Sequence, residues 1–133
     1  MNQGARQPAA LSVAALSDCL RPANGAPYSV ERYVEVLGLS ATAFASQVAA
    51  YRRSQPDAAS ASDAEVAQHF IADALQVILA VAESGVTVER AIAWFRREPL
   101  PIFEQRTAEQ LVGQGQVAQV LQFLASWQAG SQG

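Results

Sequence analysis

Few side chains in this sequence could carry out chemistry, and they do not form a recognisable catalytic or metal-binding set. The one histidine, His69, has Glu65 and Asp73 at helical spacing but no cysteine or second histidine nearby. Because structural and catalytic metals need several such ligands together, we interpret His69 as part of an exposed polar stripe. The one cysteine, Cys19, cannot form an internal disulfide and lacks a histidine or strongly basic setting that would activate its thiol. We expect a small buried residue there.

Phosphate-binding and nucleophile patterns are also missing. The sequence contains no GxxxxGK or GxGxxG motif, and the Gly113-Gln-Gly115 stretch is better explained by one helix ending and another beginning. A candidate nucleophile, base and orienting group cannot be assembled from these residues. We therefore predict a protein that is not an enzyme and needs neither a cofactor nor a metal.

The composition favours helices. The chain has 133 residues, half of them hydrophobic, only 8% of them aromatic, and many of them alanine. Abundant alanine suits close helix packing, whereas sheets need β-branched and aromatic residues. The apolar run over residues 71–82 is too short, and too interrupted by Asp73 and Gln76, to span a bilayer. With one cysteine and no secretory leader, the sequence predicts an all-α chain in the cytoplasm with no membrane contact.

Charge divides the chain into two unlike parts. The net charge is −3 and every basic residue is an arginine, which argues against a general polyanion binder. Residues 1–56 hold five arginines against three carboxylates, whereas the remainder holds four arginines against nine carboxylates. If the protein contacts nucleic acid, we expect the contact in the first half.

Residues 1–27 form an N-terminal segment and linker, with a short helix over residues 9–20 and a turn-rich stretch over residues 21–27. Residues 28–61 are helix-turn-helix-like. Ser29 can cap a helix that ends at Gly38, and Ser40 can cap a second helix after the sharp turn.

A third element of this region would begin near Tyr51 and act as the reader of DNA. Its predicted DNA-binding residues are Tyr51, Arg52 and Arg53, because forked guanidinium donors suit phosphates and guanine edges. The alternative is a solvated helix end. Pro56 shortens the reader, and Ala49 stands where such motifs often place a glycine, so base-specific reading has less support than phosphate contact.

Residues 62–133 contain the strongest helical patterns. Ser62 and Glu65 match a capping box that opens a long central helix to about Glu83. Thr87 can cap the next helix, which turns Val88, Ala91, Ile92 and Phe95 inward and leaves Glu89, Arg90, Arg96 and Arg97 for solvent or a partner. Pro99 and Pro101 then force a turn, Thr107 begins another helix, and an apolar ladder closes the chain: Val117, Val120, Leu121, Leu124 and Trp127.

The order of landmarks over residues 91–130 resembles the C-terminal domain of the MbcA/ParS/Xre antitoxin family, whose members pair with NAD-consuming RES-domain toxins. The resemblance extends more weakly to residues 28–53. The matching positions are Ala91, Trp94, Phe95, Pro99, Phe103, Thr107, Ala108, Leu111, Gly115, Val120 and Leu121.

This resemblance implies an antitoxin of a type II toxin-antitoxin system. Its C-terminal domain would occlude the active site of a RES-domain toxin, its N-terminal part would bind promoter DNA, and it would form a homodimer or a hetero-oligomer with the toxin. Carboxylates such as Glu98, Glu104 and Glu109 could mimic phosphates in an electropositive cleft. The expected toxin-binding residues are Arg96, Arg97, Glu98, Leu100, Ile102, Phe103, Glu104, Arg106 and Trp127.

Two alternatives remain open at this stage. The chain could be a stand-alone helix-turn-helix transcriptional regulator whose C-terminal domain serves only for dimerisation. Each aromatic of the elbow region, including Trp94, Phe95 and Phe103, could also fill the core of the domain itself instead of anchoring an interface.

Overall fold

The computed structural model describes residues 12–21, 26–58 and 60–132, with side chains described as far as Ser126. The described residues contain helices and no β-strand, so the predicted all-α class is confirmed. The elements in chain order are α1 (Val13–Leu20), α2 (Val30–Leu37), α3 (Ala41–Ser54), α4 (Asp63–Ala82), α5 (Val88–Arg97), the short 3-10 helix η1 (Pro101–Phe103), α6 (Ala108–Gly113) and α7 (Val117–Gln132).

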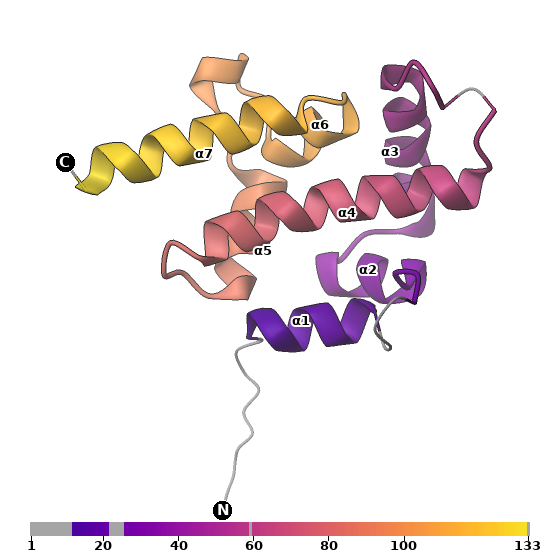
Figure 1. The fold of residues 1–133 in the computed structure, drawn as a ribbon, viewed down its shortest axis with the longest axis horizontal. Helices are drawn as coiled ribbons and strands as arrows, with labels where there is room; N and C mark the ends of the chain where they lie inside the picture. Colours follow the sequence, from indigo (N-terminus) through magenta and orange to yellow (C-terminus); the bar gives the residue numbers. More distant parts are fainter. Residues whose placement is uncertain (1–11, 22–25, 59, 133) are drawn as a thin grey trace, which may run out of the picture.

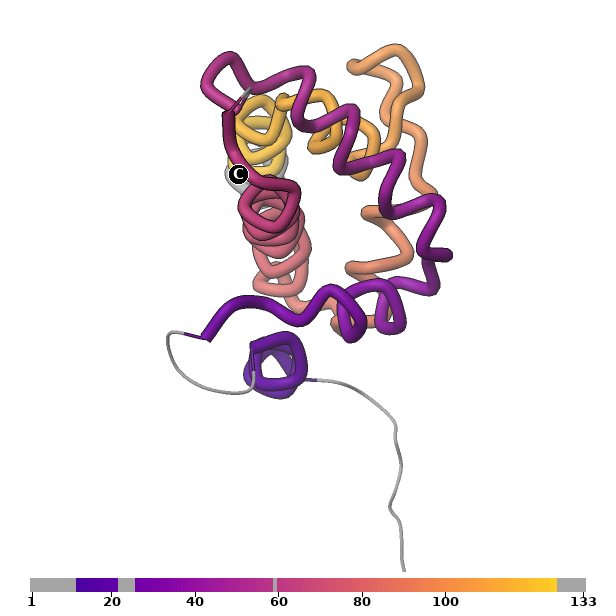
Figure 2. The backbone as a smooth tube through the Cα atoms, turned by 90° about the vertical axis from the view of Figure 1, so that its right-hand side faces the viewer, coloured from indigo at the N-terminus to yellow at the C-terminus, as the bar shows by residue number. Residues whose placement is uncertain are grey.

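Helix α4 is the centre of the fold and packs against α3, α5, α6 and α7 (Figure 1). Figure 2 looks nearly along its axis, with α7 beside it and α1 on the opposite side. The predicted capping box is present: the Ser62 hydroxyl accepts the Glu65 amide at 3.1 Å, and the Glu65 carboxylate accepts the Ser62 amide at 2.9 Å. Among the described helices, α4 alone is long and apolar enough for a membrane span, but half of that stretch is buried in the core. Burial in the core accounts for its hydropathy.

Four further helix starts agree with the sequence. Ser29, Ser40, Thr87 and Thr107 each accept the backbone amide of the third residue beyond them. Such caps satisfy amides that have no partner inside the helix. The structure adds a cap that the sequence analysis did not name, at Ser12 before α1.

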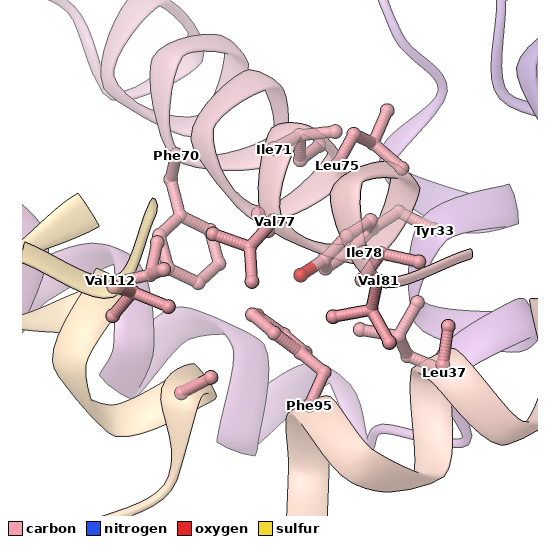
Figure 3. Close-up of a cluster of buried hydrophobic side chains, with 14 of the residues drawn as sticks. Tyr33, Leu37, Phe70, Ile71, Leu75, Val77, Ile78, Val81, Phe95 and Val112 are labelled. Atoms are coloured by element: carbon pink, nitrogen blue, oxygen red, sulfur yellow. The ribbon is translucent and has the colours of Figure 1, made fainter. Parts of the chain in front are cut away.

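A cluster of four aromatic rings joins α2 and α3 to α4. Phe70 of α4 lies 6.2 Å from Tyr33, 5.9 Å from Phe44 and 5.5 Å from Tyr51, measured between ring centroids, in edge-on arrangements. Figure 3 shows Tyr33 and Phe70 converging with Phe95 and Val112. Edge-on ring pairs add to the free energy gained by burying apolar surface. One hydrophobic core therefore spans the predicted boundary at residues 61 and 62.

The end of α3 lies close to the turn between α6 and α7, and Gly115 permits this approach. This glycine has φ +77, and a Cβ built on it would lie 2.6 Å from the Ser54 hydroxyl. Glycine is thus required both by the backbone conformation and by the close approach of α3. The predicted helix stop and restart around Gly113 and Gly115 is confirmed.

Two predictions for the N-terminal half need correction. The separate third helix beginning near Tyr51 does not exist, because α3 continues without a break from Ala41 to Ser54. Ala49 is a strong helix former, and Pro56 stops the helix only beyond Ser54. The first helix begins at Val13, and residues 9–11 of the predicted helix lie outside the described residues.

Candidate functional site

The segment between α5 and α6 forms a projecting turn, residues 99–106, which we call the elbow. It reaches beyond the helices beside it in both views (Figures 1 and 2). Pro99 and Pro101 prevent a helix from continuing here, and the chain instead makes the 3-10 turn η1. Two backbone hydrogen bonds close the base of the elbow: the Leu100 amide donates to the Arg106 carbonyl at 3.1 Å, and the Gln105 amide donates to the Leu100 carbonyl at 2.9 Å.

The second half of the elbow has a strained backbone. Glu104 and Gln105 have φ values of 61 and 67, a left-handed conformation, and neither is a glycine. Each such residue costs on the order of 1 kcal/mol or more, so the surrounding hydrogen bonds must impose the conformation. Strained residues of this kind gather at binding sites. The elbow is already formed in the free chain, with its base closed by the two backbone hydrogen bonds.

The tip of the elbow presents an apolar side chain next to a carboxylate. Ile102 is 70% exposed, the most exposed large hydrophobic residue in the described part of the chain. The Glu104 side chain is 88% exposed, and Pro101 and Gln105 are exposed as well. An exposed isoleucine forgoes the free energy that burial would provide, so Ile102 is available to a partner that buries it.

Other predicted site residues support the elbow from below. Phe103 is half-buried and packs edge-on against Phe123 of α7, with the ring centroids 5.8 Å apart. Leu100 is only 4% exposed and belongs to the core, so it offers no contact surface, contrary to the expectation for an interface residue.

Arg106 stabilises the elbow by contacts inside the molecule. Its Nε donates to the Phe103 carbonyl at 3.0 Å, its guanidinium bonds to the Gln114 side chain, and it lies 3.8 Å from the Glu104 carboxylate. Most of its donors are thus used inside the molecule.

The expectation that Arg96 faces solvent or a partner is wrong. Its Nε lies 3.2 Å from the Glu109 carboxylate, and its terminal nitrogen donates to the Leu37 carbonyl at 2.8 Å. Glu109 is itself buried, so this carboxylate is not available as a surface mimic of phosphate. Arg97 and Glu98 are exposed as expected. The side chain of Trp127 lies outside the described residues.

The predicted DNA-binding residues divide in a similar way. Tyr51 is 4% exposed, and its hydroxyl donates to the Asp73 carboxylate at 2.6 Å. Burial, followed by that hydrogen bond, raises the pKa of Tyr51. Arg52 donates to the carbonyls of Ala58 and Ala61 and pairs with Asp63. Arg53 alone of the three is exposed, and its DNA contact stays a prediction.

The structure also shows a cleft that the sequence analysis did not predict. It has a volume of about 420 Å³ and lies between the end of α4, one face of α5 and α7. Arg90, Trp94 and Arg97 follow one another along α5 at intervals of four and three residues, so they share one side of the helix. This spacing was the feature of the sequence from which one wall of the cleft could have been predicted.

Metal binding has no support in the described part of the chain, where no group of three or more His, Cys, Asp or Glu side chains could hold an ion. Comparisons with protein-family models, with curated proteins and with solved structures found no match for this chain.

Proposed function

We propose that this chain is the antitoxin of a type II toxin-antitoxin system and that it neutralises a RES-domain toxin by occluding the toxin's active site. The observation that carries the proposal is the elbow, a strained, prebuilt turn that holds Ile102 outward at 70% exposure. The order of landmarks over residues 91–130, which includes the proline elbow itself, supports the same assignment.

The mechanism is occlusion and not chemistry by this chain. A cleft that binds an anionic dinucleotide must be electropositive, and the exposed Glu98 and Glu104 carboxylates suit such a surface. Ile102 would act as the central apolar anchor. Because the elbow is already formed, binding requires little additional ordering of the antitoxin backbone.

Autoregulation through promoter DNA is the second part of the proposal. Helices α2 and α3 are joined by a short turn in which Gly38 adopts φ 72, the arrangement expected of a helix-turn-helix pair. The exposed groups on α3 that could contact DNA are Thr42, Ser46 and Arg53. A homodimer would place two such helices on one operator.

The test is co-expression with the RES-domain protein encoded beside this chain. The wild type should restore growth and be retained by the tagged toxin in a pull-down, whereas Ile102→Asp should do neither. Val30→Asp is the matched control, because Val30, like Ile102, is an exposed β-branched residue, with 37% of its surface exposed. A carboxylate at this position in the first turn of α2 also suits the helix dipole. If Ile102→Asp neutralises the toxin as well as Val30→Asp does, the elbow is not the toxin-binding site.

A stand-alone transcriptional regulator is the alternative, favoured by the α2–turn–α3 geometry and by the exposed Arg53. Arg53→Ala separates the two functions better than a change that includes Arg52, since Arg52 holds the chain that follows α3. Under the regulator alternative, Arg53→Ala weakens salt-dependent binding to upstream DNA and no toxin is neutralised by the wild type.

A further inference from the structure

The cleft beside α5 combines apolar walls with two arginines and one carboxylate, Glu98. Its walls are mainly apolar and include the buried Leu124 of α7 and Val86, which is 37% exposed. Arg90 and Arg97 stand on either side of Trp94 along α5. In the described part of the chain, neither guanidinium has an ion-pair partner. The lining residues are Val81, Ser84, Val86, Arg90, Ala93, Trp94, Arg97, Glu98 and Leu124.

The elbow has the complementary chemistry on the same chain. Ile102 at its tip is 70% exposed, and the neighbouring Glu104 side chain is 88% exposed. An isoleucine on a rigid turn fits an apolar cleft, and a carboxylate two residues away can reach an arginine at its edge. Two exposed arginines are also unusual in the C-terminal half, where carboxylates outnumber arginines nine to four.

We propose that the cleft lined by Arg90, Trp94 and Arg97 is a docking site for the elbow of a second copy of this chain, with Ile102 in the apolar part and Glu104 paired with one of the two arginines. The contact joins two different surfaces, so a mutual exchange of elbows closes into a symmetric pair, whereas a one-way contact leaves an elbow and a cleft free and continues into a longer assembly. It does not depend on a toxin. An elbow seated in a neighbouring copy is unavailable to any other partner.

The experiment uses the purified full chain alone and measures its mass by sedimentation or light scattering over a range of concentrations. The wild type should reach at least twice the 14.1 kDa mass of one chain. The elbow variant Ile102→Asp and the cleft variant Arg90→Glu/Arg97→Glu should each remain monomeric. Val30→Asp, which changes an exposed residue outside both surfaces, should associate like the wild type.

Mixing the two variants decides the matter. The elbow variant retains an intact cleft and the cleft variant retains an intact elbow, so an equimolar mixture should form a species of two chains through one contact, at higher concentration than the wild type, even though neither variant associates alone. Circular dichroism confirms that each variant is folded, and Ile102→Ser replaces Ile102→Asp if the aspartate unfolds the chain. A monomeric wild type, self-association that survives in either variant, or a mixture that stays monomeric would each overturn the proposal. None of these results bears on toxin neutralisation, because no toxin is present.

Discussion

Helices α3 and α5 end in the same way, yet their final arginines do different work. Each helix has two adjacent arginines in its last turn and is followed shortly by a proline, Pro56 after α3 and Pro99 after α5. In both pairs the first arginine turns inward and the second is exposed. Two stretches that the sequence analysis assigned to contacts with DNA and toxin therefore each contribute one structural arginine and one surface arginine.

The partners of the inward arginines separate the two regions. Arg52 binds carbonyls 6 and 9 residues away and pairs with Asp63, whose side chain is 96% exposed. Arg96 binds the Leu37 carbonyl 59 residues away and pairs with Glu109, whose side chain is 9% exposed. The two arginines are equally exposed, at 27% and 26%, so the difference lies in their partners. Arg52 fixes a local turn and pairs with an exposed carboxylate, whereas Arg96 joins α2, α5 and α6 and pairs with a carboxylate that water barely reaches. The same pair of arginines at a helix end can therefore stabilise either a local turn or contacts between distant helices.

The largest predicted effect is that of Arg96→Ala. The change leaves the Glu109 carboxylate and the Leu37 carbonyl without their partner, and we expect a loss of about 3 kcal/mol in the free energy of unfolding. Urea denaturation measures this. Arg97→Ala is the matched control and should change the value by less than about 0.5 kcal/mol. Equal losses for the two neighbours would show that the inward pair does not hold the fold together.

Arg52→Ala should cost less. Its two carbonyl partners lie in one neighbouring turn, and the Asp63 carboxylate that it leaves behind is 96% exposed and stays hydrated, so we expect a loss of about 1 kcal/mol in the free energy of unfolding. Arg53→Ala is the control and should be close to neutral. A cost for Arg52→Ala that equals or exceeds that of Arg96→Ala would reverse the proposed distinction between a local and a long-range arginine.

Tyr51→Phe tests whether α3 is anchored inward at the position that was predicted to read DNA. Loss of the hydrogen bond to Asp73 should cost about 1 kcal/mol at neutral pH. Since the pKa of Tyr51 is raised in the folded state, its contribution is full below its ordinary pKa of about 10 and is lost as pH rises beyond that value. Urea denaturation at increasing pH should therefore bring wild type and variant together. A difference that stays constant with pH would contradict this account.

The smallest effect concerns Glu65 in the capping box of α4. The Ser62 amide lowers the pKa of Glu65, so its contribution to stability is full above the ordinary carboxyl pKa of about 4.3 and is lost as pH falls through the lowered value. Glu65→Gln keeps a cap without a titrating group. Melting temperatures of the two proteins should approach each other in acid. A gap that widens in acid would mean that the carboxylate is not stabilised by the cap.

The helix starts and the elbow could be predicted because both depend on local chemistry. Ser and Thr caps, the capping box of Ser62 and Glu65, and the prolines around Leu100 act over a few residues of chain. The end of α3 was predicted less well. A separate element near Tyr51 was expected although Ala49 replaces the usual glycine, and alanine continues a helix readily.

The orientation of the arginines and the burial of Leu100 and Glu109 could not be predicted. A charged residue next to another on a helix end looks the same in sequence whether it meets water or a distant carbonyl. The choice for Arg96 is made by Leu37 and Glu109, which reach it only after α2 and α6 have packed. The cleft beside α5 also needs Leu124 of α7 and was hidden for the same reason.

The central claim is that the elbow projects Ile102 as an anchor for another protein. Calorimetric titration of the neighbouring RES-domain protein with wild type and with Ile102→Asp tests it most directly, with melting temperatures recorded for both. We predict that affinity falls at least about tenfold while the melting temperature stays the same, as expected for an interface anchor. Equal affinities for wild type and Ile102→Asp would contradict the account.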